Sequence, residues 1–294
     1  MLAAILLLQS PPIARISLAA IDEGSGIVAS RRYPGVFWTH NDSGDSARFF
    51  AIRADGTAVM PKKYNRKEDA GAAAPPPSPF EGIKVEVAQN IDWEDIAYDG
   101  ETLYLADTGN NANARRDLGV YAVQEPNPAE TERTRPYAWY PVEYPEQKAF
   151  PPLEGDLLWD CEAVFHLRGK LYFLTKTRSP QGIPKGISRL YRLDDPKTDK
   201  VNSLRFLDAK SDFGGWVTAA DASPDGKRLA VLTHFPQAAV WLFDAKAPGD
   251  KFLSRPLKTI PLTNAGQCEA ICFEPDGNSV LVTNEGRDIF RIAL

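Results

Sequence analysis

Hydrophobic and polar positions alternate along this chain in a pattern that recurs five times. In each copy a short polar segment, usually with a carboxylate, is followed by an apolar run that ends in polar residues. The copies begin at Glu23, Glu94, Glu162, Thr218 and Glu269, so successive starts are 71, 68, 56 and 51 residues apart. Repeats of this length are typical of β-propellers, whose four-stranded blades take roughly 40–50 residues each. The pattern therefore predicts one blade for each copy.

The strands within a blade are predicted from short apolar runs between turns. In the first copy these runs lie near Ile27 and at residues 36–39, 48–53 and 83–88, and in the third at residues 163–167, 170–175, 188–193 and 203–208. Asp-Gly pairs at 99–100, 225–226 and 276–277 stand between first and second strands, where a tight hairpin is expected. The fold class predicted is therefore all-β.

The fifth copy has no room for a fourth strand, since the chain ends at Leu294. The apolar run at residues 13–20 belongs to no blade and is expected to complete the fifth one, which leaves no exposed sheet edge. We therefore predict a single propeller of five four-stranded antiparallel blades closed by the N-terminal strand. Six blades remain an alternative if the long first interval holds a degenerate one.

The rest of the chain adds little to this single-domain picture of residues 11–294. Residues 1–10 begin with the apolar MLAAILLL and are interpreted as the remnant of a secretory signal, which predicts a periplasmic or extracellular protein. Residues 62–80 carry Ala and Pro tracts and predict a flexible insertion. The net charge of −5 gives no reason to expect nucleic acid, and no apolar stretch is long enough for a membrane span. A monomer is assumed.

The polar ends of the repeats predict a metal site at one mouth of the propeller channel. Within an antiparallel blade the first strand starts where the second one ends, and the first strand is the innermost. Oxygen ligands without a His/Cys cluster favour Ca²⁺, with Mg²⁺ second. The structural alternative is that each glutamate only caps its own blade. The candidate metal ligands are Glu23, Asn41, Asp42, Glu94, Asp107, Glu162, Glu269 and Asn284.

Basic and amide side chains near the same mouth predict a site for a small anionic ligand, because Asn- and Gly-rich turns and arginines suit a phosphate or carboxylate. The candidates are Asn110, Asn111, Arg115, Arg116, Lys176 and Arg287. His234 ends the second strand of the copy that lacks the glutamate, which makes it the candidate base, with Asp107 beside it as a second catalytic candidate. Ordinary hydrogen-bonded loop residues are the alternative interpretation.

Two motifs carry a resemblance to known propellers. DWEDIA at residues 92–97 followed by DTGNN at 107–111, and the opening SGI…WTHNDSG at 25–44, resemble a widespread group of bacterial propeller proteins. More distantly the chain is similar to the superfamily of gluconolactonase-type lactonases, calcium-dependent phosphotriesterases and esterase-like phytases. The resemblance implies an exported propeller with one Ca²⁺ at the channel mouth, for which Glu23, Asn41, Asp107, Glu162 and Asn284 are suitable residue types.

Two functions follow from these patterns. One is a metal-dependent hydrolase that acts on an ester, lactone or phosphoester at the mouth. The other is a non-catalytic propeller that binds a protein or glycan partner over the same face. A mouth closed by Trp93, Trp159 or Trp216 would favour the second function.

Overall fold

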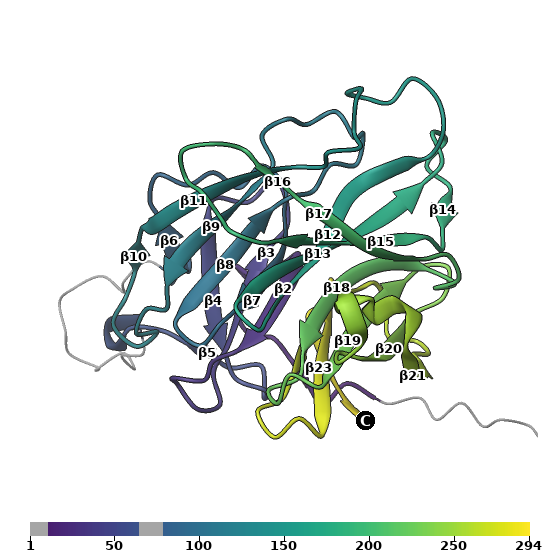
Figure 1. Cartoon of the computed structure of the whole chain (residues 1–294). Helices are drawn as coiled ribbons and strands as arrows, with labels where there is room; N and C mark the ends of the chain where they lie inside the picture. The colour runs from purple at the N-terminus through teal and green to yellow at the C-terminus, as the bar shows by residue number, and fades with distance from the viewer. Residues whose placement is uncertain (1–10, 65–78) are drawn as a thin grey trace, which may run out of the picture.

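Five antiparallel sheets follow one another around a ring in the computed structural model, which describes residues 11–64 and 79–294 (Figure 1). The first strand of each sheet contacts the first strands of the two neighbouring sheets, and the fifth contacts the first. The predicted five-bladed propeller is confirmed. Predicted and observed strands agree closely; residues 188–193, for example, form one strand, β15.

Blades one and two are the ones with long intervals. The strands of blade one are β2 (Gly24–Ala29), β3 (Phe37–Asn41), β4 (Arg48–Ile52), β5 (Ala58–Val59) and β6 (Ile83–Val85), with the 3-10 turn η1 (Lys62–Tyr64). Those of blade two are β7 (Trp93–Tyr98), β8 (Thr102–Asp107), β9 (Gly119–Gln124) and β11 (Pro136–Glu143). Short parallel strands extend both blades: β10 (Arg133–Thr134) pairs with β6, and β16 (Asn202–Ser203) pairs with β11.

Blades three to five are more compact. Blade three has β12 (Leu157–Leu167), β13 (Lys170–Arg178), β14 (Pro184–Lys185), β15 (Ser188–Leu193) and β17 (Arg205–Lys210). Blade four has β18 (Trp216–Ala222), β19 (Arg228–His234), β20 (Ala239–Asp244) and β21 (Pro256–Pro261), with the 3-10 turns η2 (Pro248–Asp250) and η3 (Phe252–Ser254). Blade five has β22 (Cys268–Phe273), β23 (Ser279–Asn284) and β24 (Asp288–Ala293).

The N-terminal segment closes the ring. β1 (Ala14–Arg15) pairs antiparallel with β24, and the amides of Ile13 and Ile16 extend the pairing to the carbonyls of Ile289 and Arg287. Figure 1 shows this purple segment beside the yellow C-terminal strands. The closing strand is shorter than the predicted 13–20, because the Ser17 amide already turns away to the Gly56 carbonyl of blade one.

The core is divided among the blade interfaces. In the described part of the chain each pair of neighbouring blades encloses its own hydrophobic cluster; between blades five and one, for example, Ile27 and Phe50 pack with Leu281 and Ile289. Apolar faces on both sides of a blade explain why nearly every position of the inner strands is buried. This packing holds the polar ends of the inner strands rigidly around the channel.

Residues 1–10 and 65–78 lie outside the described residues, so the signal remnant and most of the predicted insertion at 62–80 stay predictions. At the edges of that insertion Tyr64 and Phe80 pack ring to ring, 5.2 Å between centroids. No helix in the described ranges is long and apolar enough to cross a membrane.

Candidate metal site at the channel mouth

A β-bulge is the structural basis of the sequence repeat. In all five blades the pairing of the first and second strands skips one residue of the first strand. The skipped residues are Ser25, Glu94, Glu162, Thr218 and Glu269. A bulge re-aims the side chain of its extra residue, so it separates this position from the regular alternation of the strand.

The register corrects the sequence alignment of the first copy. Glu23 was expected to share the position of the later glutamates, but Ser25 occupies it. Glu23 lies two residues earlier, is exposed, and precedes β2. The bulge glutamates therefore number three in this alignment rather than four, and Glu23 corresponds instead to Asp92 and Asp160.

Two overlapping groups of carboxylates lie at the mouth. One oxygen each of Asp42, Asp92 and Glu94 lie within 4.8 Å of one another, and the same holds for Glu94, Asp160 and Glu162. Glu94, Asp160 and Glu162 are buried, whereas Asp42 and Asp92 are partly exposed. Glu94 belongs to both groups and joins them into one acidic cluster, which we define as these five residues.

Basic side chains neutralise one end of the acidic cluster. Lys176 Nζ lies 2.5 Å from Glu162 Oε1 and 3.9 Å from Asp160 Oδ2. Arg178 Nη2 donates to Asp160 Oδ2 at 2.8 Å. Both cations pack on the ring of Trp216, at 5.3 and 5.1 Å from its centroid. The group of Asp42, Asp92 and Glu94 has no such counter-charge in direct contact within the described residues.

Burial and like charge perturb the ionisation of the cluster. Burial raises the pKa of Glu94 well above its usual value, and the neighbouring Glu162 raises it further. Burial, then the charges of Asp42 and Asp160, raise the pKa of Asp92 to about 6. Glu269 lies nearby, and burial raises its pKa to about 7. The site therefore holds carboxyls that take up protons near neutral pH unless a cation replaces them.

The bulge residues fall into two kinds. The hydroxyls bond across the blade interface: Ser25 Oγ donates to the Glu94 carbonyl at 2.6 Å, and Thr218 Oγ1 to the Cys268 carbonyl at 3.0 Å. Within the described chain Glu94 and Glu162 accept no backbone N–H. In blades one and four the bulge residue therefore bonds to the neighbouring blade, whereas Glu162 pairs with Lys176 and Glu94 has no such partner within the described residues.

Several predicted ligands are committed to loop structure. Asn41 Nδ2 donates to the Ala20 carbonyl and to the carboxylates of Asp22 and Asp45. Asn284 Nδ2 donates to the Ala265 carbonyl, and its Oδ1 accepts the Asp288 amide. Their amide nitrogens therefore shape the loops behind the mouth, whereas Asn41 Oδ1 is buried and has no hydrogen-bond partner among the described residues.

Asp107, which is buried, forms an ion pair with the partly exposed Arg115, 2.8 Å between Nη2 and Oδ1. Asp107 Oδ1 also accepts the Asp92 amide at 3.1 Å, and Arg115 donates to the Gly109 carbonyl at 2.8 Å. Asn110 is likewise buried, with its amide nitrogen bonded to the Trp159 carbonyl and its backbone N–H to Asp160. These hydrogen bonds fix the backbone at Asp92 and the carboxylate of Asp160.

The remaining predicted residues lie around the rim or away from it. Asn111 is exposed and accepts from Arg178, which links it to the acidic cluster. Arg116 packs on the Phe150 ring, 4.0 Å from its centroid, beside the outer part of blade two. Arg287 is partly buried in the turn before β24, with a positive φ of 67°. Of the predicted ligand-binding residues, Lys176 makes the closest contact with the acidic cluster.

His234 ends β19 opposite Trp216 in the strand register. Its buried Nδ1 has no hydrogen-bond partner among the described residues. Burial, assisted by the positive charge of Lys176, lowers its pKa. The lowered pKa favours the neutral imidazole, and Nδ1 keeps a free hydrogen-bonding position.

Asp92 and Asp160 were missed as site residues, and Trp216 was expected only as a possible closure of the mouth. A signal was present: both buried glutamates stand in an Asp-x-Glu step, at 92–94 and 160–162. The contact of Arg178 with Trp216 had no comparable signal, because it joins blades three and four through space.

Asp95 is fully buried and joins the inner strands of three blades. It follows the bulge at a position that is Gly or Ala in the other four blades. Its Oδ2 accepts the amides of Val164 and Ala220, from blades three and four, at 3.0 and 3.4 Å. The carboxylate thus ties blades two, three and four together next to the acidic cluster.

Comparisons with known proteins show a distant likeness only. No family model matches the chain, and no curated protein matches it. A glutaminyl cyclase from Myxococcus xanthus aligns over 97% of this chain and 94% of its own, at 14% identity and a TM-score of 0.45. A chain of a mitotic checkpoint complex (98% and 94% covered, 10% identity, TM-score 0.38) and U3-55K (97% and 98%, 8%, 0.40) are similar at the same level. The propeller assignment rests on the strand pairing itself.

Proposed function

We propose that the channel mouth binds a divalent cation, Ca²⁺ first and Mg²⁺ second. The observation that carries this proposal is the Glu94 carboxylate. It is about 95% buried, has no hydrogen bond or ion pair within the described residues, and lies within 4.8 Å of carboxylate oxygens of Asp42 and Asp92. A buried charge without a partner is costly, and a bound cation removes that cost.

The donor atoms decide the class of metal. The set of Asp42, Asp92 and Glu94 offers carboxylate oxygens, without the His and Cys ligands that Zn²⁺ prefers. Two of the three side chains are partly exposed, which leaves a path for the ion from solvent. The second group, around Asp160 and Glu162, is neutralised by Lys176 and Arg178 and serves as the wall of the site.

We further propose that the mouth hydrolyses a small anionic ester, lactone or phosphoester. A cation held by Glu94 would act as a Lewis acid toward the substrate oxygen. Lys176 lies beside the acidic cluster and offers a positive charge to an anionic group, and Trp216 fixes its direction. The neutral His234 is the proton acceptor in this proposal. The resemblance to calcium-dependent lactonases and phosphotriesterases points to the same chemistry, and export would place the site where Ca²⁺ is abundant.

A non-catalytic binding propeller is the second candidate. Trp216 is partly exposed and covers one side of the mouth with two cations on its ring. Phe235, 55% exposed, follows His234 on the same blade. An aromatic rim of this kind suits a protein or glycan partner. Trp93, by contrast, is fully buried between blades one and two and takes no part in a rim.

The metal proposal is tested by thermal unfolding in chelator and in excess Ca²⁺, Mg²⁺ or Zn²⁺. A cation that binds only the folded chain stabilises it by about 2.7 kcal/mol at a hundredfold excess over its Kd. We expect a shift with Ca²⁺, a smaller one with Mg²⁺, and loss of both in Glu94→Gln. Glu101→Gln, an exposed glutamate in the hairpin at the other end of blade two, is the matched control. Equal melting temperatures in chelator and calcium would refute the proposal.

The hydrolase proposal is tested separately with lactone, aryl-ester and phosphoester substrates in the presence of calcium. His234→Ala and Glu94→Gln should abolish any turnover, whereas Glu101→Gln should retain it. Calcium binding without turnover of any substrate would favour the binding propeller instead.

A further inference from the structure

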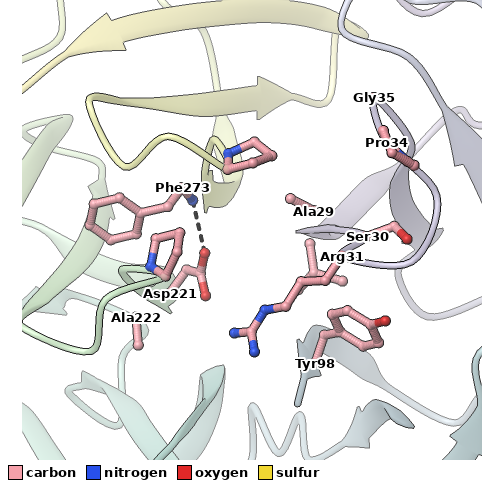
Figure 2. A pocket seen from close by; sticks show the side chains of 12 residues that line it. Ala29, Ser30, Arg31, Pro34, Gly35, Tyr98, Asp221, Ala222 and Phe273 are labelled. Carbon is pink, nitrogen blue, oxygen red and sulfur yellow. Dashed lines mark hydrogen bonds between the residues drawn. The ribbon is translucent and has the colours of Figure 1, made fainter. Parts of the chain in front are cut away.

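A cavity of about 400 Å³ lies at the other end of the channel, away from the acidic cluster. The ends of first strands from four blades contribute to it, through Ala29, Tyr98, Ala222 and Phe273. Figure 2 shows these side chains arranged around one opening. Its volume falls within the range of small-molecule sites, and most of its lining is apolar, including Pro34.

One positive charge reaches into this cavity. Arg31 leaves the turn after β2, and Figure 2 shows its guanidinium pointing into the opening. Its Nη1 donates to the Asp99 carbonyl at 3.2 Å, and its guanidinium lies 6.0 Å from the centre of the Tyr98 ring. No carboxylate of the described residues lies within ion-pair distance of it. The remaining guanidinium N–H groups are free to bind an anion.

One negative charge faces the same cavity from blade four. Asp221 stands on β18 at a register position that carries Val28, Ala97, Phe165 and Cys272 in the other blades. Its Oδ2 accepts the Phe273 amide at 2.8 Å, which fixes the carboxylate, as Figure 2 shows. It likewise has no cation within ion-pair distance in the described chain. This carboxylate therefore stands at an otherwise apolar position and has backbone donors but no cation in direct contact.

Arg31 and Asp221 thus line one cavity with opposite charges and do not pair with each other. A ligand with two groups of opposite charge would satisfy both side chains. Its carboxylate would match the Arg31 guanidinium, and its ammonium group would match the Asp221 carboxylate. A ligand with only one of these groups leaves the other side chain unsatisfied. The apolar lining favours a hydrocarbon skeleton between or beside the two charges.

We propose that this cavity binds a compact zwitterion with one carboxylate, one ammonium group and an apolar skeleton, the class of the apolar α-amino acids and their ω-amino homologues. The carboxylate lies on Arg31 and the ammonium group on Asp221. The site is separate from the acidic cluster, because the two lie at opposite ends of the first strands. It does not depend on a metal, so chelator leaves binding unchanged.

Burial gives this site a pH dependence. It raises the pKa of Asp221 to about 7. Asp221 must be ionised to hold an ammonium group, so affinity rises as pH increases through 7. The other charged or titratable groups that act on Asp221 are Arg31, Asp95 and Cys272. Arg31 carries its positive charge throughout this range.

The experiment is isothermal titration calorimetry of the whole chain in chelator. The probes are L-leucine, L-phenylalanine and 6-aminohexanoate, compared with 4-methylpentanoate, which lacks the amine, and 3-methylbutylamine, which lacks the carboxylate. We expect a zwitterion to bind and each single-charge probe to bind at least about tenfold more weakly, since charged hydrogen bonds contribute 1.5–3 kcal/mol. The α- and ω-amino probes distinguish the spacing of the two charges.

Variants connect the binding to the two residues. Arg31→Gln and Asp221→Asn should each weaken zwitterion binding at least about tenfold, whereas Arg32→Gln, whose guanidinium packs on Tyr33 instead, should not. Asn keeps an acceptor for the Phe273 amide, and Arg31 is exposed, so neither change removes a core contact. Failure of every zwitterion to bind at millimolar concentration, equal binding of the single-charge probes, or binding unaffected by Arg31→Gln would overturn the proposal.

Discussion

Glu269→Gln should change the pH dependence of stability by a predictable amount. Glu269 is the bulge residue of blade five. Burial raises its pKa from 4.5 to about 7; the positive charge of Lys176 opposes this rise, and the negative charges of Glu285 and Asp42 add to it. Its folded pKa lies above its unfolded pKa, so the folded state binds the proton more tightly. That stabilisation is complete below pH 4.5 and is lost as pH rises through 7.

The magnitude follows from the two pKa values. A change from 4.5 to about 7 corresponds to on the order of 3 kcal/mol at 1.36 kcal/mol for each tenfold change in proton affinity. This is an upper bound, because the side chain is partly open to solvent. Gln does not ionise, so the variant does not lose this stabilisation as the pH rises. Relative to the wild type, Glu269→Gln should gain up to about 3 kcal/mol in unfolding free energy between pH 4.5 and about pH 8.

The assay is urea unfolding of both chains across this pH range in chelator, so that metal binding does not contribute. Glu101→Gln is the control, since this exposed side chain should leave the difference near zero at every pH. A constant free-energy difference between Glu269→Gln and wild type from pH 4.5 to pH 8 would show that Glu269 titrates as an ordinary surface carboxyl, and the electrostatic account of the mouth would fail.

Three further outcomes test the fold. Ile16→Ala, in the buried part of the closing segment, should cost about 2–5 kcal/mol in chemical unfolding, whereas Ile13→Ala, 45% exposed, should cost less than about 0.5; equal costs would mean that the segment does not close the ring. Asp95→Ala leaves the amides of Val164 and Ala220 without their acceptor and should lower the free energy of unfolding by about 1–3 kcal/mol for each. Asp95→Asn should cost less. A fully stable Asp95→Ala would contradict the role of this carboxylate in joining three blades. The three cysteines are free and buried, so a thiol reagent should label none in the native chain and all of them in denaturant, and rapid native labelling would argue against these positions.

Much of the fold could be predicted from the sequence because the information is local. Alternating apolar residues and Asp-Gly turns specify strands and hairpins, and a repeat specifies how often the unit recurs. The missing last strand and the unused N-terminal run also indicated closure. The parallel additions β10 and β16 were not predicted, since two-residue strands leave no periodic signal in the sequence.

The acidic mouth could be predicted only in outline. The repeat placed Glu94, Glu162 and Glu269 at one end of the blades, but it set Glu23 beside them in place of Ser25. A bulge shifts the register by one residue, and only strand pairing reveals where it falls. Sequence spacing also could not show that the side-chain NH2 groups of Asn41 and Asn284 donate to carbonyls of nearby loops.

The sequence by itself determined the propeller fold, favoured five blades closed by the N-terminal segment, and indicated the end at which carboxylates gather, because these follow from patterns within short segments. The tertiary structure alone decided which charges meet. Glu94 joins Asp42 across blades one and two, Lys176 joins Glu162 within blade three, and Arg31 shares a cavity with Asp221. The Lys176–Glu162 contact depends on the bulge in blade three. The other two depend on the angles between blades, which arise from the packing of the whole ring and leave no spacing rule in the chain.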